Sequence, residues 1–110
     1  MAITNFDSIG LADGLTVGAS GTLMTQFRVY SQSLNVASVA ANTSAAQTFT
    51  VTGLTTADKV TVTKPTLTAG IVIGNARVSA ANTLIIQFGN LTGSPIVPGA
   101  EVYTIVALRS

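Results

Sequence analysis

The sequence predicts an all-β fold, an antiparallel β-sandwich of jelly-roll-like type that carries an extended N-terminal arm. Two observations predict it. Short runs rich in β-branched residues alternate apolar and polar side chains with a period of two, and turn-forming residues separate them every 8 to 12 residues or so. No segment of the chain shows a helical period, which favours a sandwich or jelly roll over a mixed fold. With 110 residues the chain is the size of one domain. We expect residues 1–23 to form the arm and residues 24–110 the sandwich.

The predicted arm spaces single apolar residues between glycines, a pattern too broken for a regular buried strand. A frayed terminus is one interpretation, since most domains have one. The other is an arm that docks on a partner, because disordered tails are usually poor in large apolar side chains. On that interpretation the candidate contact residues of the arm are Ile3, Phe6, Ile9 and Leu11.

Two strands are expected next, over residues 25–30 ("TQFRVY") and 34–39 ("LNVASV"). The second is less regular, because Val36 and Val39 break the alternation, and this break predicts a bulge. Phe27 occupies a position typical of a core residue.

Three further runs predict strands whose apolar residues share one face, and in the first two the other face is exposed and rich in Thr. They are "QTFTVTG", "KVTVTK" and "NTLIIQFG", with the predicted inward residues Phe49, Val51, Val60, Val62, Leu84, Ile86 and Phe88.

The last run, "EVYTIVALR", is apolar on both faces. Val102, Val106 and Leu108 share one face, and Tyr103, Ile105 and Ala107 share the other. Strands that are covered on both faces carry apolar residues on both, so the run is predicted to be a central strand or part of an interface. We take Tyr103, Ile105 and Ala107 as the candidate subunit-interface residues.

An internal echo links two of these runs. "AANTSAAQTFTVTG" begins at Ala40 and "AANTLIIQFGNLTG" at Ala80, and both are expected to form a turn, a strand and a turn. Turn composition in a Thr-rich chain accounts for the match, and a duplicated structural unit is the alternative.

Composition excludes most chemistry. The chain has no His and no Cys, which removes imidazole bases, imidazole metal ligands and thiolate ligands. Its four acids are scattered along the sequence, at Asp7, Asp13, Asp58 and Glu101, without a local pair or a calcium-loop pattern. We therefore expect no enzymatic activity, no catalytic residue, no cofactor and no metal. A net charge of +1 and 8% charged residues favour neither nucleic acid nor a membrane as a partner.

The segment "KPTLTAGIVIGNARVSAANTLIIQFGNLTGSPIVPGAEVYTIVALR" resembles small β-sandwich virion proteins of tailed bacteriophages, the capsid cement or decoration proteins among them. The resemblance covers about residues 33–110 and consists of strands and turns rather than active-site motifs. It implies a structural virion protein that binds the outside of a phage shell at capsomer junctions and stabilises it.

The same resemblance implies the partners and the location. The major capsid protein would be one partner and two further copies of the chain the others, in a homotrimer on the capsid surface. The arm residues Ile3, Phe6, Ile9 and Leu11 then become candidate capsid contacts. Related segments occur in fibres, so the alternative function is a head- or tail-fibre module that binds a receptor or carbohydrate. Sugar sites usually show exposed aromatic residues, and here only Tyr30 and Tyr103 are expected to be available.

Overall fold

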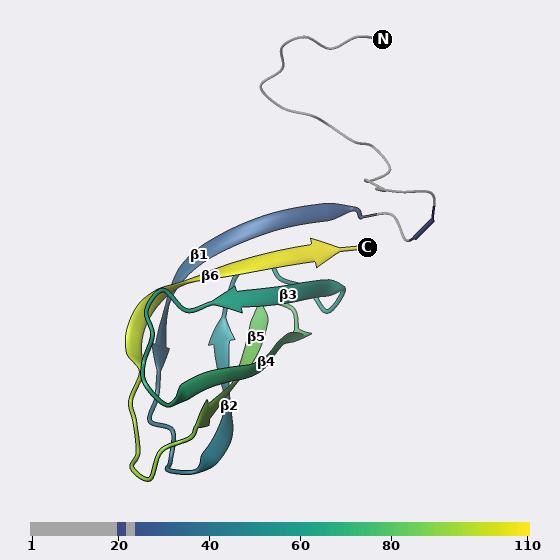
Figure 1. Cartoon of the computed structure of the whole chain (residues 1–110). Coiled ribbons are helices and arrows are strands. Elements are labelled where there is room, and N and C mark those ends of the chain that lie inside the picture. Colours follow the sequence, from purple (N-terminus) through teal and green to yellow (C-terminus); the bar gives the residue numbers. More distant parts are fainter. Residues whose placement is uncertain (1–19, 22–23) are drawn as a thin grey trace, which may run out of the picture.

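The computed structural model describes residues 20–21 and 24–110, and this part of the chain is all-β, without a helix (Figure 1). Two antiparallel three-stranded sheets pack together, which confirms the predicted sandwich. The six strands are β1 (Gln26–Val36), β2 (Thr43–Thr50), β3 (Asp58–Thr63), β4 (Ile71–Ala80), β5 (Thr83–Asn90) and β6 (Gly99–Arg109).

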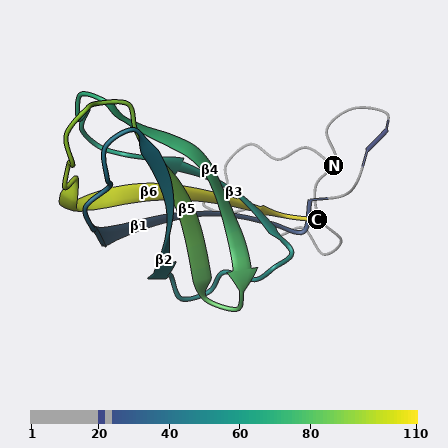
Figure 2. The same ribbon diagram turned by 90° about the horizontal axis from the view of Figure 1, so that it is seen from below.

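The strand order is β1-β6-β3 in one sheet and β2-β5-β4 in the other. The first strand therefore pairs with the last and the second with the fifth, and this nesting is how a long antiparallel hairpin rolls up into a jelly roll. The strands of the two sheets cross steeply when the molecule is viewed from below (Figure 2). Because β6 lies between β1 and β3, the prediction of a central last strand is confirmed.

The core lies between the two central strands. Leu84, Ile86 and Phe88 of β5 are completely buried, as the alternation predicts. Phe88 meets Tyr103 of β6 edge to face, with ring centroids 6.5 Å apart and an interplanar angle of 89°. Aromatic rings prefer such an edge contact because the positive rim of one ring faces the negative face of the other.

Strand β1 differs from its prediction in two respects. It is one continuous strand from Gln26 to Val36 rather than two, because it pairs with β6 along its whole length. No bulge separates Val36 from Val39. The chain instead leaves the sheet after Val36, and Val39 is held by a separate bridge to Ile96. The register shifts lie in β4.

Both halves of the internal echo begin with the same turn. Asn42 and Asn82 have φ angles of 53° and 61°, in the left-handed region that Asn tolerates better than most residues. Each turn leads directly into a strand, and these two strands, β2 and β5, are antiparallel neighbours. The prediction of a turn followed by a strand is confirmed for both halves.

Two ion pairs fix β6 to the neighbouring segments. Arg109 donates to both carboxylate oxygens of Asp58, at 3.0 Å from Nε and 2.9 Å from Nη2. The Nζ atom of Lys64 lies 2.9 Å from Oε1 of Glu101. Hydrogen bonds from Arg109 lower the pKa of Asp58, and the hydrogen bond from Lys64 lowers the pKa of Glu101. Both acids in the described part of the chain therefore serve the fold.

Candidate functional site

The last strand does not present its predicted interface residues to a partner. Tyr103, Ile105 and Ala107 are at most 3% exposed and lie in the core of the chain's own sandwich. Placing a subunit interface on these side chains is therefore wrong. The opposite face of β6 is the open one, where Val102 is 56% and Leu108 39% exposed.

That open face carries an apolar strip, which we define as Phe27 and Val29 of β1 with Val106 and Leu108 of β6. In the β1–β6 ladder Phe27 is directly opposite Leu108, and Val29 is opposite Val106. Phe27 and Val29 are 58% and 57% exposed, so the prediction that Phe27 is a core residue is wrong. Two adjacent apolar rows on an open sheet face indicate a surface that contacts another protein.

The sequence conceals this strip, because both alternating sets in "TQFRVY" contain an aromatic residue. Phe27 and Val29 form one set, and Tyr30 belongs to the other. Only the pairing with β6 shows that Tyr30 packs toward the core while Phe27 and Val29 point outward. The outward apolar set of β6 was visible in the sequence, but its partner on β1 was not.

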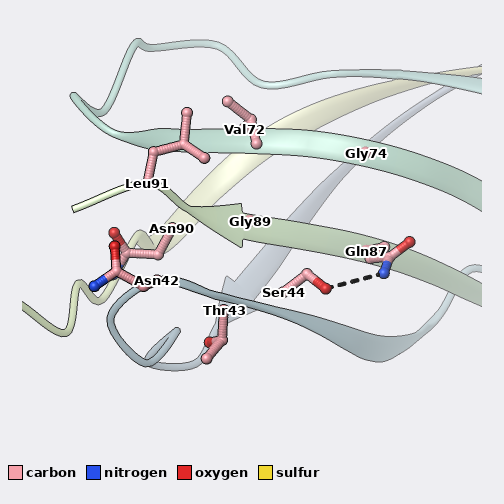
Figure 3. Close-up of a pocket in the computed structure, with 9 residues that line it drawn as sticks. All are labelled: Asn42, Thr43, Ser44, Val72, Gly74, Gln87, Gly89, Asn90 and Leu91. Atoms are coloured by element: carbon pink, nitrogen blue, oxygen red, sulfur yellow. Dashed lines mark hydrogen bonds between the residues drawn. The ribbon is translucent and has the colours of Figure 1, made fainter. Parts of the chain in front are cut away.

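A second surface is a groove on the outside of the other sheet, lined from β2, β4 and β5 (Figure 3). Its volume is about 460 Å³. Gly74 and Gly89 have no side chain, so the surface is recessed at the centre of the groove. A Cβ on Gly89 would lie 2.8 Å from Cγ2 of Val72, so a larger residue at this position would displace the Val72 side chain. The lining residues are Asn42, Thr43, Ser44, Val72, Gly74, Gln87, Gly89, Asn90 and Leu91.

The groove offers uncharged polar groups. Gln87 donates from Nε2 to Oγ of Ser44 at 3.2 Å (Figure 3). An adjoining hollow of about 220 Å³ shares Gln87 and adds Asn75 and Arg77. Amides, hydroxyls and one guanidinium can bind neutral hydroxyl-rich ligands, but no aromatic ring lines either hollow. Tyr103, expected to be available for a sugar, is buried in the core.

A third surface, the loop end, consists of exposed apolar side chains on two loops. Leu67 lies between β3 and β4, and Leu91 and Val97 lie between β5 and β6; they are 102%, 72% and 65% exposed. The backbone N–H of Leu91 donates to the carbonyl of Gly70 at 2.9 Å, which joins the two loops.

Buried Asn90 makes the β5–β6 loop rigid. Its Nδ2 donates to the carbonyls of Val39 and Ser94, at 3.0 and 2.8 Å, and its Oδ1 accepts from the N–H and hydroxyl of Thr92. Leu91 and Val97 of the loop end are therefore carried on a loop that these hydrogen bonds tie to the rest of the sandwich.

The predicted arm contacts Ile3, Phe6, Ile9 and Leu11 lie outside the described residues. Within residues 20–21 and 24–110, no group of three or more acidic, His or Cys side chains is placed to hold a metal ion. The same residues contain no helix long and apolar enough to cross a membrane.

Comparisons of the chain with protein-family models, with curated proteins and with solved structures give no match.

Proposed function

We propose that this chain is a structural virion protein of the capsid cement type, which binds the outside of a phage shell and stabilises it. The observation that carries the proposal is the apolar strip on an open sheet face of a chain with only 8% charged residues. Such a surface suits a permanent contact with protein, whose centre is apolar and poor in charge. The resemblance of residues 33–110 to phage virion proteins supports the same function.

Two surfaces of the chain would make different contacts on the shell. The strip joins copies of the chain to one another in a trimer, and the loop end contacts the major capsid protein. The loop end suits that role because it exposes Leu67, Leu91 and Val97 on two loops that a backbone hydrogen bond joins. Each such side chain stabilises a contact by about 1.5 to 3 kcal/mol when fully buried, before ordering costs are subtracted.

The test is co-sedimentation of the purified chain with empty shells of the virus whose genome encodes it. Saturable binding and a higher disruption temperature of the decorated shells are expected. The double variant Leu91→Ser with Val97→Ser should reduce occupancy at least about tenfold, since one lost anchor of 1.4 kcal/mol is already tenfold. Thr48→Ser, on the exposed face of β2, is the matched control and should bind like the wild type. Absence of binding to intact shells would contradict the proposal.

The groove favours a second candidate function, a fibre module that binds a receptor or carbohydrate. Its amides and hydroxyls around a glycine floor are the supporting observation. Glycan-array binding by the wild type, lost in Gln87→Ala and kept in Gln47→Ala, would support this function. An array without binding above background would count against it.

A further inference from the structure

The arm carries a sequence pattern that matches the apolar strip. Residues 7–18, "DSIGLADGLTVG", consist of two six-residue repeats, each reading Asp, small, apolar, small, apolar, then Ala or Gly. In an extended chain alternate side chains share a face. One face of the extended segment would therefore carry Asp7, Ile9, Leu11, Asp13, Leu15 and Val17, and the other only Ser, Gly, Ala and Thr.

The spacing of each repeat fits the strip. Ile9 and Leu11 are two residues apart in the arm, as are Leu15 and Val17. On the strip, the Phe27–Leu108 pair and the Val29–Val106 pair are also two residues apart along β1. Side chains with the same spacing along extended backbones can interdigitate row by row when the backbones lie face to face. The small residues on the other face of the segment leave no second apolar surface exposed after docking.

The charges are complementary as well. All five Lys and Arg residues and two of the four acids lie in residues 24–110, giving this part a net charge of +3, whereas residues 1–19 hold only Asp7 and Asp13. Asp58 and Glu101 are taken up in ion pairs. Lys59, opposite Leu108 in the β3–β6 ladder, has no ion-pair partner within the described residues and lies at the end of the strip. Beside it a hollow of about 250 Å³ is lined by Met24, Lys59, Leu108, Arg109 and Ser110.

The point at which the arm is attached to the sandwich favours a neighbouring copy over the same chain. The N–H and hydroxyl of Thr25 both donate to the carbonyl of Arg109, at 2.6 and 3.0 Å. Thr25 is therefore still held against the last residue of β6, so the arm is attached at the end of the sheet. An arm that docked on its own strip would have to reverse its direction directly before Thr25. Nineteen residues reach about 60 Å when extended, more than enough to span to a second copy.

We propose that the repeat segment of one copy docks, extended, on the apolar strip of a second copy. The proposal deepens the proposed function, on which it rests for the oligomer, and it gives the arm a second copy rather than the capsid protein as its partner. Exchange of arms would tie the copies of a trimer together, and a charged residue in the strip would release them.

Site-directed disulfides test this directly, because the chain has no native Cys. One preparation of the full chain carries Val29→Cys. A second, distinguishable by mass, carries Cys at Ile9, Leu11, Leu15 or Val17 in turn. After mixing under mild oxidation, at least one pair should form the mixed disulfide dimer about tenfold faster than the controls, because docking raises the effective concentration of the thiols.

Two matched controls define the background rate. Ala12→Cys lies on the small face of the arm, and Thr48→Cys lies on the exposed face of the other sheet. Adding Leu108→Asp to the Val29→Cys chain should reduce the rate to that background. Circular dichroism checks that every variant keeps the β signal.

Two results would overturn the inference. Rates at background for all four arm positions would show that the strip is not the site of the arm. If chains carrying both cysteines form only disulfide-closed monomers, the arm covers its own strip and no exchange occurs. Neither result bears on shell binding, which co-sedimentation measures separately.

Discussion

At the scale of single residues, the face that a side chain occupies decides its contribution to stability. Phe88 is completely buried, whereas Thr50 of the neighbouring strand is exposed. Truncating Phe88 to Ala should lower the free energy of unfolding by about 3 to 5 kcal/mol, because it leaves a cavity beside Tyr103. Thr50→Ala should cost less than about 1 kcal/mol. Urea denaturation of both variants checks this, and equal costs would refute the face assignment.

The Asp58–Arg109 pair predicts a dependence of stability on pH. Hydrogen bonds from Arg109 hold the pKa of folded Asp58 below its ordinary value of 3.8. A group with a lowered folded pKa stabilises the fold fully above its unfolded pKa, and this stability is lost as pH falls through the folded value. The pair should therefore contribute a constant amount from pH 5 to pH 8 and progressively less below about pH 4.

The measurement compares the wild type with Asp58→Asn by urea denaturation at pH 7 and pH 3. The wild type should be the more stable at pH 7, and the difference should shrink at pH 3. A difference of the same size at both values would mean that the ionised carboxylate is not what the fold uses.

At the scale of elements, side chains join the two sheets where the backbone cannot. Along the edge formed by β1 and β2, Gln47 accepts from the N–H of Ala37 at 2.8 Å and donates to its carbonyl at 3.1 Å. Gln32 of β1 likewise donates to the backbone carbonyl of Thr50. The side-chain hydrogen bonds of Gln32 and Gln47 connect the two sheets along an edge where, in the described part of the chain, no backbone hydrogen bonds join β1 to β2.

Replacing Gln47 with Ala should therefore lower the free energy of unfolding by about 1 kcal/mol, the typical net value of such hydrogen bonds. Gln87→Ala is the matched control and should cost less than about 0.5 kcal/mol, since the Gln87 side chain is exposed and, among the described residues, bonds only to the Ser44 hydroxyl. Thermal denaturation of both variants ranks them. A Gln87 variant at least as destabilised as the Gln47 variant would contradict this account of the edge.

The elements differ in how well the sequence predicts them. β5 could be assigned completely, because Leu84, Ile86 and Phe88 share one face and all three are buried. β1 could not, because both of its faces carry large side chains, and only pairing with β6 determines which face is covered. From the sequence alone the Tyr103 face of β6 is predicted to be an interface, because a face covered by the other sheet has the same apolar pattern as one covered by a neighbouring subunit.

Two of the candidate surfaces, the groove and the apolar strip, likewise cannot be predicted from local sequence patterns alone. The glycines of the groove are visible in the sequence, but the groove needs the register that places Gly89 opposite Val72 and Ser44. The apolar strip needs the pairing of Phe27 with Leu108 across 81 positions of sequence. Local patterns do not contain such distant partners.

At the scale of the whole molecule, the low charge and the apolar strip predict an oligomer, with a trimer expected from the resemblance. Light scattering at micromolar concentration should give a mass well above the 11.1 kDa of one chain. Val29→Asp should shift the mass toward the monomer, because position 29 faces Val106 and burying a carboxylate there without a basic partner is costly. A wild-type chain that stays monomeric throughout this range would contradict a preformed oligomer.

If the chain decorates a phage shell as proposed, cryo-electron microscopy of intact phage particles whose genome carries its gene is the most direct test. The proposed function predicts density for the six-stranded sandwich on the outside of the shell, at the junctions between capsomers. That density should disappear from particles lacking the gene and return when the purified chain is added. Sandwich density on a head or tail fibre, with bare capsomer junctions, would contradict the account and favour receptor binding.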